Sequence, residues 1–177
     1  MNLFNLNNKR TIYLLVLIMI ISGIFGFVYE TIFYRIELGY FVKRGSSIGP
    51  WIPIYAFGGL LVVLLSYRFR NNPFILFIVC IIITGILEYF TGLFIYEVMG
   101  KRLWDYNSEI WNFGNVDGFI CLRSLLFFGV SSLFLIYIVV PFILKITHKL
   151  KDNELKMISI PLALIFLFDI IIYSLIN

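Results

Sequence analysis

The sequence predicts an all-α membrane protein, a bundle of about five transmembrane helices with a re-entrant or interfacial loop between the third and the fourth. Of its 177 residues, 61% are hydrophobic, 19% are aromatic and only 14% are charged, whereas soluble domains carry about 25% charged residues. A hydrocarbon core about 30 Å thick takes roughly 20 apolar residues per helix. Five such helices use more than half the chain, so we predict a single transmembrane helical domain over residues 1–177 without a soluble catalytic domain.

Five apolar segments predict the individual helices. The first, residues 11–34, follows Lys9 and Arg10 and continues into more apolar sequence without a small-residue cleavage site, which favours a transmembrane helix over a signal peptide. The second, residues 52–67, is short and opens at Pro53, which the first helical turn tolerates. Three further helices are expected over residues 73–99, from about 119 or 123 to 144, and 157–176.

The stretch between the third and fourth helices, residues 103–118, is polar, aromatic and glycine-containing. Non-helical backbone at membrane depth must be shielded by protein because lipid offers it no hydrogen-bond partners. This stretch is therefore predicted to be the interfacial or re-entrant loop.

The distribution of Lys and Arg predicts the orientation, because short cytoplasmic loops carry an excess of these residues. A cytoplasmic N-terminus puts eight of them inside and six outside, and five helices then leave the C-terminus extracytoplasmic. The inside set is Lys9, Arg10, Arg68, Arg70, Lys145, Lys149, Lys151 and Lys156; the outside set is Arg35, Lys43, Arg44, Lys101, Arg102 and Arg123.

Two glutamates lie within predicted helices near the extracytoplasmic face. Glu30 follows Ser22 and Gly26 at four-residue spacing, and such small residues favour close helix packing, so Glu30 is expected to face the bundle. Glu88 shares a helix face with Thr84. Intramembrane carboxylates are costly and mark functional sites by default; a purely structural role in helix packing is the alternative. We predict that both glutamates belong to one buried polar cluster.

Three arginines are the natural partners of this cluster: Arg44, Arg102 and Arg123. A guanidinium pairs with a carboxylate or a phosphate in two-point geometry, so these side chains either neutralise the glutamates or hold an anionic group such as a lipid phosphate. The neighbouring residues that complete the candidate site are Trp51, Tyr55, Trp104, Asp105 and Tyr106.

Other chemistries find little support in the sequence. The two cysteines, Cys80 and Cys121, lie far apart and His148 is the only histidine, so neither a metal site nor a cofactor is expected. No phosphate loop of the form GxxxxGK[ST] occurs, and the scattered basic residues indicate membrane lipids rather than nucleic acid. Cys121 and Ser124 are weak candidates for a nucleophile. For Asp169, in the fifth helix, a structural hydrogen bond and a proton-relay role both remain open.

Five short strings of motif residues follow one another along the chain. They are Gly26-Phe-Val-Tyr-Glu30, residues 44–55 from Arg44 to Tyr55, Leu87-Glu-Tyr-Phe-Thr91, Arg102-Leu-Trp-Asp-Tyr106 and Gly118-Phe-Ile-Cys-Leu122. In this order and spacing they resemble the bacterial CmpB-type family of ABC-transporter permeases. The resemblance covers roughly residues 26–124. It implies a small multi-pass protein of the bacterial inner membrane, part of a transporter, with an ATPase or another membrane subunit as partner.

Three functions stay open at this point. The resemblance favours a permease-like transport protein. An extracytoplasmic polar pocket would suit a membrane-embedded enzyme or a protein that binds an anionic lipid head group. An accessory membrane subunit without a ligand of its own is the third hypothesis.

Overall fold

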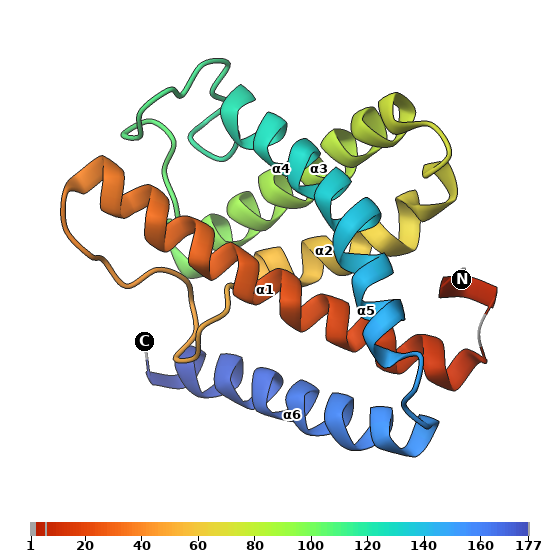
Figure 1. Ribbon diagram of the computed structural model, residues 1–177. Helices are drawn as coiled ribbons and strands as arrows, with labels where there is room; N and C mark the ends of the chain where they lie inside the picture. Colours follow the sequence, from red (N-terminus) through yellow and green to blue (C-terminus); the bar gives the residue numbers. More distant parts are fainter. Residues whose placement is uncertain (1–2, 6, 177) are drawn as a thin grey trace. The chain divides into compact units, whose positions relative to one another are not determined.

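The structure is a computed structural model that describes residues 3–5 and 7–176. Within them the elements are helices joined by loops (Figure 1). Four helical stretches are long and apolar enough to cross a bilayer: α1 (Asn8–Leu38), α3 (Pro73–Met99), the continuous run of α4 (Leu122–Phe134), the π-helical segment Leu135–Val139 and α5 (Val140–Thr147), and α6 (Asp152–Ile176). The prediction of an all-α membrane protein is confirmed.

The second predicted helix, α2 (Pro53–Ser66), is shorter than the others. It has 14 residues and runs into a 3₁₀ turn of three, Tyr67–Phe69. At 1.5 Å per residue the two together span about 25 Å, less than the roughly 30 Å of a hydrocarbon core.

Two helices, α1 and α6, are longer than predicted because capping residues define their ends. Asn7 accepts from the amide of Lys9 and starts α1 early, and Gly39 ends it in the left-handed conformation that glycine adopts without strain. Glu154 accepts from the amide of Lys151 at 2.6 Å, so α6 begins at Asp152. The connection between the helices predicted to end at residue 144 and to begin at residue 157 is therefore reduced to residues 148–151.

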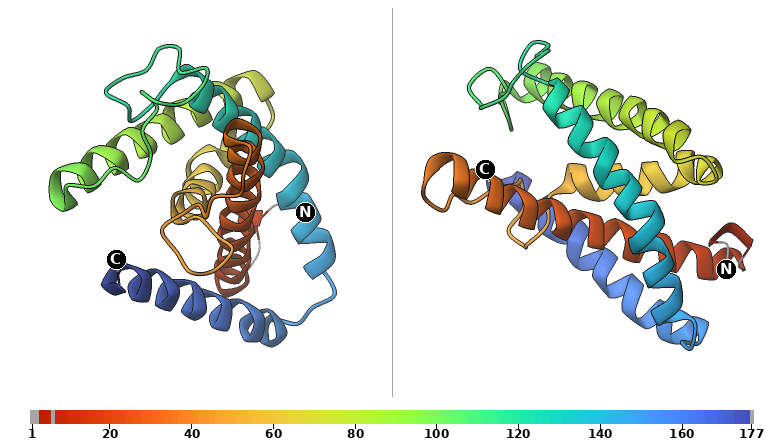
Figure 2. Two further views of the ribbon diagram at one scale, coloured as in Figure 1. Left: turned by 90° about the vertical axis from the view of Figure 1, so that its left-hand side faces the viewer. Right: turned by 45° about the horizontal axis from the view of Figure 1, so that its top comes forward.

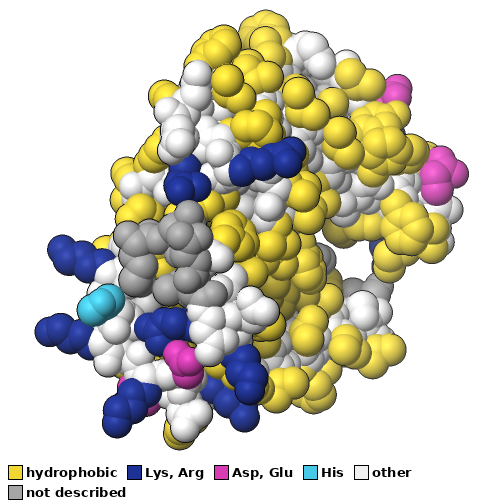
Figure 3. Space-filling view, turned by 90° about the vertical axis from the view of Figure 1, so that its right-hand side faces the viewer, with side chains coloured by type: hydrophobic (Ala, Val, Ile, Leu, Met, Phe, Trp, Pro, Cys, Tyr) yellow, Lys and Arg dark blue, Asp and Glu magenta, His cyan; other side chains and the backbone are white. Residues whose placement is uncertain are grey.

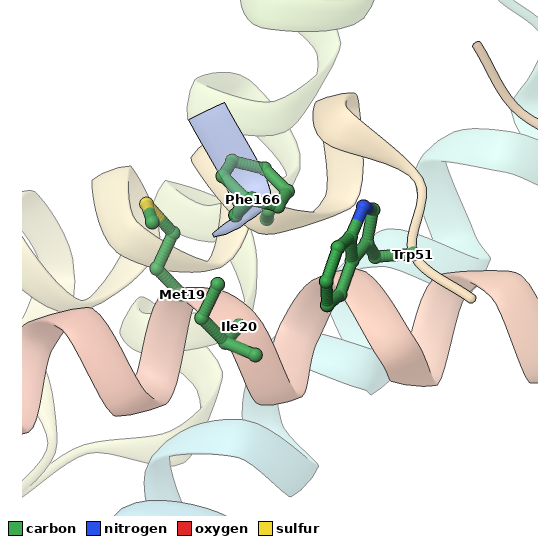
Figure 4. Packing of buried hydrophobic residues seen from close by; sticks show 5 residues of the cluster. Met19, Ile20, Trp51 and Phe166 are labelled. Atoms are coloured by element: carbon green, nitrogen blue, oxygen red, sulfur yellow. The ribbon is translucent and has the colours of Figure 1, made fainter. Parts of the chain in front are cut away.

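The chain divides into two compact units, and each is described here by itself. In the first, which runs up to Leu60 and resumes at Leu135, α1 packs against α6 (Figures 1 and 2). Trp51 lies edge-to-face on Phe166, with 5.6 Å between ring centroids. Met19, Ile20 and Ala56 complete this buried cluster (Figure 4).

The second unit, Leu61–Phe134, is built on the packing of α3 against α4. Glycines permit their close approach: a Cβ at Gly85 would meet Leu125, and one at Gly129 would meet Phe77 and Ile81. The prediction of a single domain stays a prediction, since the structure defines these units only separately.

A loop of the first unit, residues 39–52, folds back along α1. The amide of Ile52 donates to the carbonyl of Gly23 at 3.0 Å, although α1 continues to Leu38. Fifteen residues of helix correspond to about 22 Å, so α2 starts beside the middle of α1. We call residues 39–52 the re-entrant segment. It precedes α2, whereas the sequence predicts a re-entrant or interfacial loop only between the third and fourth helices.

Candidate functional site

Asp169 on α6 holds the re-entrant segment in place. Its carboxylate accepts hydrogen bonds from the amides of Ile48 at 3.0 Å and Gly49 at 3.1 Å, and from the indole Nε1 of Trp51 at 2.6 Å. We call this arrangement the Asp169 clamp. It supports a structural role for Asp169, which is one of the two roles that the sequence allows.

Residues 47–52 of the re-entrant segment also form hydrogen bonds with one another. The hydroxyl of Ser47, fully buried, donates to the carbonyl of Trp51, and the amide of Trp51 donates to the carbonyl of Gly49 at 2.9 Å. Non-helical backbone inside a membrane persists only where protein supplies such partners. The segment meets that condition along residues 47–52.

Glu30 and Arg44 form an ion pair in the same unit. Arg44 Nε donates to Glu30 Oε2 at 3.0 Å, and the guanidinium lies 3.7 Å from the ring centroid of Tyr34. Tyr55 packs on α1 so closely that a Cβ at Gly26 would overlap its ring. Gly26, one of the small residues spaced four apart before Glu30, thus leaves room for Tyr55 beside α1.

In the second unit, Glu88 is the most deeply buried carboxylate of the predicted site, at 3% exposure. It accepts from the Tyr106 hydroxyl at 2.5 Å and from Ser124 Oγ at 2.9 Å. We call these three residues the Glu88 centre. Among residues 3–5 and 7–176, Glu88 makes no ion pair; its partners are both hydroxyl groups. Burial raises the pKa of the Tyr106 phenol well above its usual range, and the neighbouring Glu88 raises it further.

An ion pair lies directly beside the Glu88 centre. Arg123 Nη2 and Glu109 Oε2 are 2.5 Å apart, with side chains 16% and 8% exposed. The guanidinium also sits 5.4 Å from the ring centroid of Tyr106. Glu109 cannot be recognised as a site residue from the sequence, because a glutamate in a polar loop carries no spacing signal that separates it from its solvated neighbours.

The loop between α3 and α4 is ordered by its own side chains. Arg102 Nη1 donates to the carbonyl of Asp117 at 2.7 Å and lies 3.6 Å from Asp105. Trp104 Nε1 donates to the carbonyl of Phe119 at 2.9 Å. Three of the predicted site residues, Arg102, Trp104 and Asp105, thus contribute to the internal structure of this loop.

Gly118 explains how that loop closes. Its φ of +77° is readily accessible only to glycine, and a Cβ there would overlap the side chains of Asp105 and Arg102. The sequence marks this position only as part of a motif string; the reason for a glycine becomes visible when the loop is folded.

The structure assigns the predicted site residues to two groups. Glu30, Arg44, Trp51 and Tyr55 lie in the first unit, and Glu88, Arg102, Trp104, Asp105, Tyr106 and Arg123 in the second. A single cluster that joins Glu30 to Glu88 stays a prediction. Within the described part of the chain, no three His, Cys, Asp or Glu side chains lie close enough to hold a metal ion.

Comparison with known proteins identifies the family. The family described as "Putative ABC-transporter type IV" (CmpB) matches residues 17–174, nearly the whole chain. The chain belongs to this family. The resemblance read from the five motif strings is thereby confirmed. Neither the curated proteins nor the solved structures gave a match.

Proposed function

We propose that the chain is the membrane-spanning subunit of an ATP-driven transport system of the bacterial inner membrane and works with a separate ATPase. The observation that carries this proposal is the family match over residues 17–174, which includes most of the four long apolar helices. The 177 residues contain no phosphate loop. ATP hydrolysis is therefore assigned to a partner.

The positions at which the helices begin and end support a multi-pass topology with five crossings as part of this proposal. Arg10, near the start of α1, donates to the carbonyls of Thr147 at 2.7 Å and Leu150 at 3.0 Å, and pairs with Asp152 at 2.8 Å. The start of α1 and the turn between α5 and α6 thus lie on one side. A chain that returns to the side it left has crossed an even number of times.

The short helix α2 supplies the crossing that this count requires. Between Arg10 and Thr147 the chain has three long helical stretches, an odd number, so α2 makes the fourth crossing. The re-entrant segment explains how about 25 Å of helix is sufficient, because the chain already reaches the level of Gly23 before α2 begins. The long helix α6 is the fifth crossing.

The basic residues support a cytoplasmic N-terminus. Of the six Lys and Arg assigned outside, three are ion-paired within the fold: Arg44, Arg102 and Arg123. Arg10 of the inside set is ion-paired as well. Setting these four arginines aside leaves seven Lys and Arg inside against three outside, a stronger bias than eight against six.

Reporter fusions test this topology. A reporter inserted at Asn153 should be active as a cytoplasmic fusion, and one at Asn177, which lies outside the described residues, as an extracytoplasmic fusion. If both reporters give the same side, α6 does not cross and the five-crossing topology is wrong.

We assign the Glu88 centre to the transport function. A carboxylate buried in a membrane helix without an ion pair is expensive and is retained where a substrate or ion pathway uses it. The chain should be affinity-purified from cross-linked native membranes, the co-purifying ATPase identified, and the complex reconstituted in vesicles. We expect Glu88→Gln to uncouple ATP hydrolysis from transport while the complex stays assembled.

Glu97→Gln is the matched control, since Glu97 lies exposed near the end of the same helix. If the two variants transport equally well, Glu88 is not needed for transport, and the chain would be an accessory subunit. Failure of any ATPase to co-purify would contradict the ATP-driven system itself.

The anion-pocket hypothesis finds less support. An anion pocket requires a positively charged side chain that is not already neutralised by a carboxylate. The three predicted arginines are instead paired with Glu30, Asp105 and Glu109. An enzyme or lipid-binding protein with an extracytoplasmic anion site would therefore need a cation from outside this set.

A further inference from the structure

The net charge of the chain is concentrated at one place. The formal charge is +4, from 14 Lys and Arg against 10 Asp and Glu. Residues 1–10 and 145–156 together contain six Lys and Arg and two acidic residues, so these two segments account for the whole excess. The remaining chain holds eight residues of each sign.

The fold brings these two segments together. Arg10 bridges from α1 to the end of α5 and to Asp152 on α6, and it neutralises that carboxylate. The remaining lysines are all exposed and form no ion pair with a described residue. We call them the basic patch: Lys9, Lys145, Lys149, Lys151 and Lys156. In Figure 3 the Lys and Arg side chains gather around the single histidine, His148.

The location of the basic patch indicates what covers it. It lies where α1 begins, α5 ends and α6 begins, at the ends of three apolar helices, which is the level of the lipid head groups. Exposed apolar side chains adjoin the lysines in sequence: Ile12 at 57%, Ile146 at 54% and Met157 at 75% exposure. A ligand that contacts both the lysines and these apolar side chains needs a negatively charged group and an apolar group.

We propose that the basic patch binds anionic phospholipids, with the lysines on the lipid phosphates and the adjoining apolar residues on the acyl chains. An acidic protein would match the lysines but would leave the apolar side chains to lipid. Each lysine near an anionic surface strengthens association roughly fivefold. Five lysines against one uncompensated carboxylate, Glu154, are therefore sufficient for selectivity between anionic and zwitterionic lipids.

Native mass spectrometry of the full chain in a neutral detergent tests this proposal. The protein is titrated with dioleoyl-phosphatidylglycerol, with dioleoyl-phosphatidylcholine and with soluble glycerol 3-phosphate. We expect the unmodified protein to bind phosphatidylglycerol in preference to phosphatidylcholine and to bind negligible soluble phosphate. The preference should fall by at least about tenfold in the triple variant Lys149→Gln, Lys151→Gln, Lys156→Gln.

The control is a second triple variant that removes the same number of cations elsewhere: Lys43→Gln, Arg68→Gln and Lys101→Gln. It should retain the phosphatidylglycerol preference. Equal losses in both triple variants, or no preference for phosphatidylglycerol in the unmodified protein, would overturn the proposal.

If the patch variant does not fold, the salt dependence of lipid binding tests the proposal. NaCl must weaken phosphatidylglycerol binding to the unmodified protein and leave phosphatidylcholine binding unchanged. Retention of the preference at high salt would then overturn the proposal.

Discussion

Asp169 in the first unit and Glu88 in the second are both carboxylates on long apolar helices, yet they have opposite kinds of partner. Asp169 accepts from two backbone amides and an indole, groups that can only donate. Glu88 accepts from two hydroxyls, which can donate or accept. Asp169 must therefore offer its oxygens as acceptors for the fold to persist, whereas the Glu88 centre can redistribute its protons without losing a hydrogen bond.

This difference assigns the two carboxylates to different tasks. The Asp169 clamp joins residues about 120 positions apart and holds the re-entrant segment at the level from which α2 starts. The Glu88 centre links α3, α4 and the loop between them at separations of 18 and 36 residues. The first holds the fold together, whereas the second can keep its hydrogen bonds when its protons move, as the proposed transport role requires.

The largest effect is expected at the Asp169 clamp. Asp169→Ala leaves three N–H donors without an acceptor. The cost is about 1–3 kcal/mol each for the part-buried Gly49 amide and Trp51 indole, and less for the exposed Ile48 amide. The apparent Tm in detergent should fall by about 5–10 °C or more. Glu97→Ala, which removes an exposed carboxylate, should leave the Tm within about 1 °C. Equal Tm values for both variants would show that the clamp does not hold the fold.

A smaller effect is expected at the ion pair beside the Glu88 centre. Arg123→Met leaves Glu109 buried without its cation and should cost about 2–4 kcal/mol, somewhat less than a fully buried pair because both side chains keep some exposure. The double variant Arg123→Met, Glu109→Gln should recover part of that loss. Strict additivity of the two Tm changes would mean that the pair does not interact in the folded protein.

The helices of this fold can be predicted from the sequence, because a bilayer requires long apolar runs and α1, α3 and α6 contain them. The re-entrant segment cannot. Its amides depend on Asp169, which is 121 residues from Ile48, and no local pattern encodes such a partner. The motif strings identify Glu88 and Tyr106 by resemblance, but only the folded loop shows that one donates to the other.

Packing of Tyr55 against α1 predicts the next effect in size. A Cβ at Gly26 would overlap the Tyr55 ring, so Gly26→Ala must displace the start of α2 and should cost about 1–3 kcal/mol. Adding Tyr55→Leu should relieve this overlap and restore part of the lost Tm. If Gly26→Ala proves as stable as the unmodified protein, α2 does not lie this close to α1.

The smallest effect on stability is expected at Glu88 itself, despite its deep burial. In Glu88→Gln the side-chain oxygen can accept from one hydroxyl, and the new NH₂ group can donate to the other, because Tyr106 and Ser124 are able to reverse their roles. The Tm should change by no more than about 2–4 °C, corresponding to about 1 kcal/mol. Glu88→Leu, which keeps the volume but leaves both hydroxyls without this partner, should cost about 1–3 kcal/mol for each hydroxyl that stays unsatisfied.

The proposed difference between the two carboxylates is wrong if Asp169→Asn is tolerated as well as Glu88→Gln. In Asp169→Asn the NH₂ group faces N–H donors that cannot accept, so a lower Tm for Asp169→Asn than for Glu88→Gln is the result that distinguishes a fixed acceptor from an adaptable one.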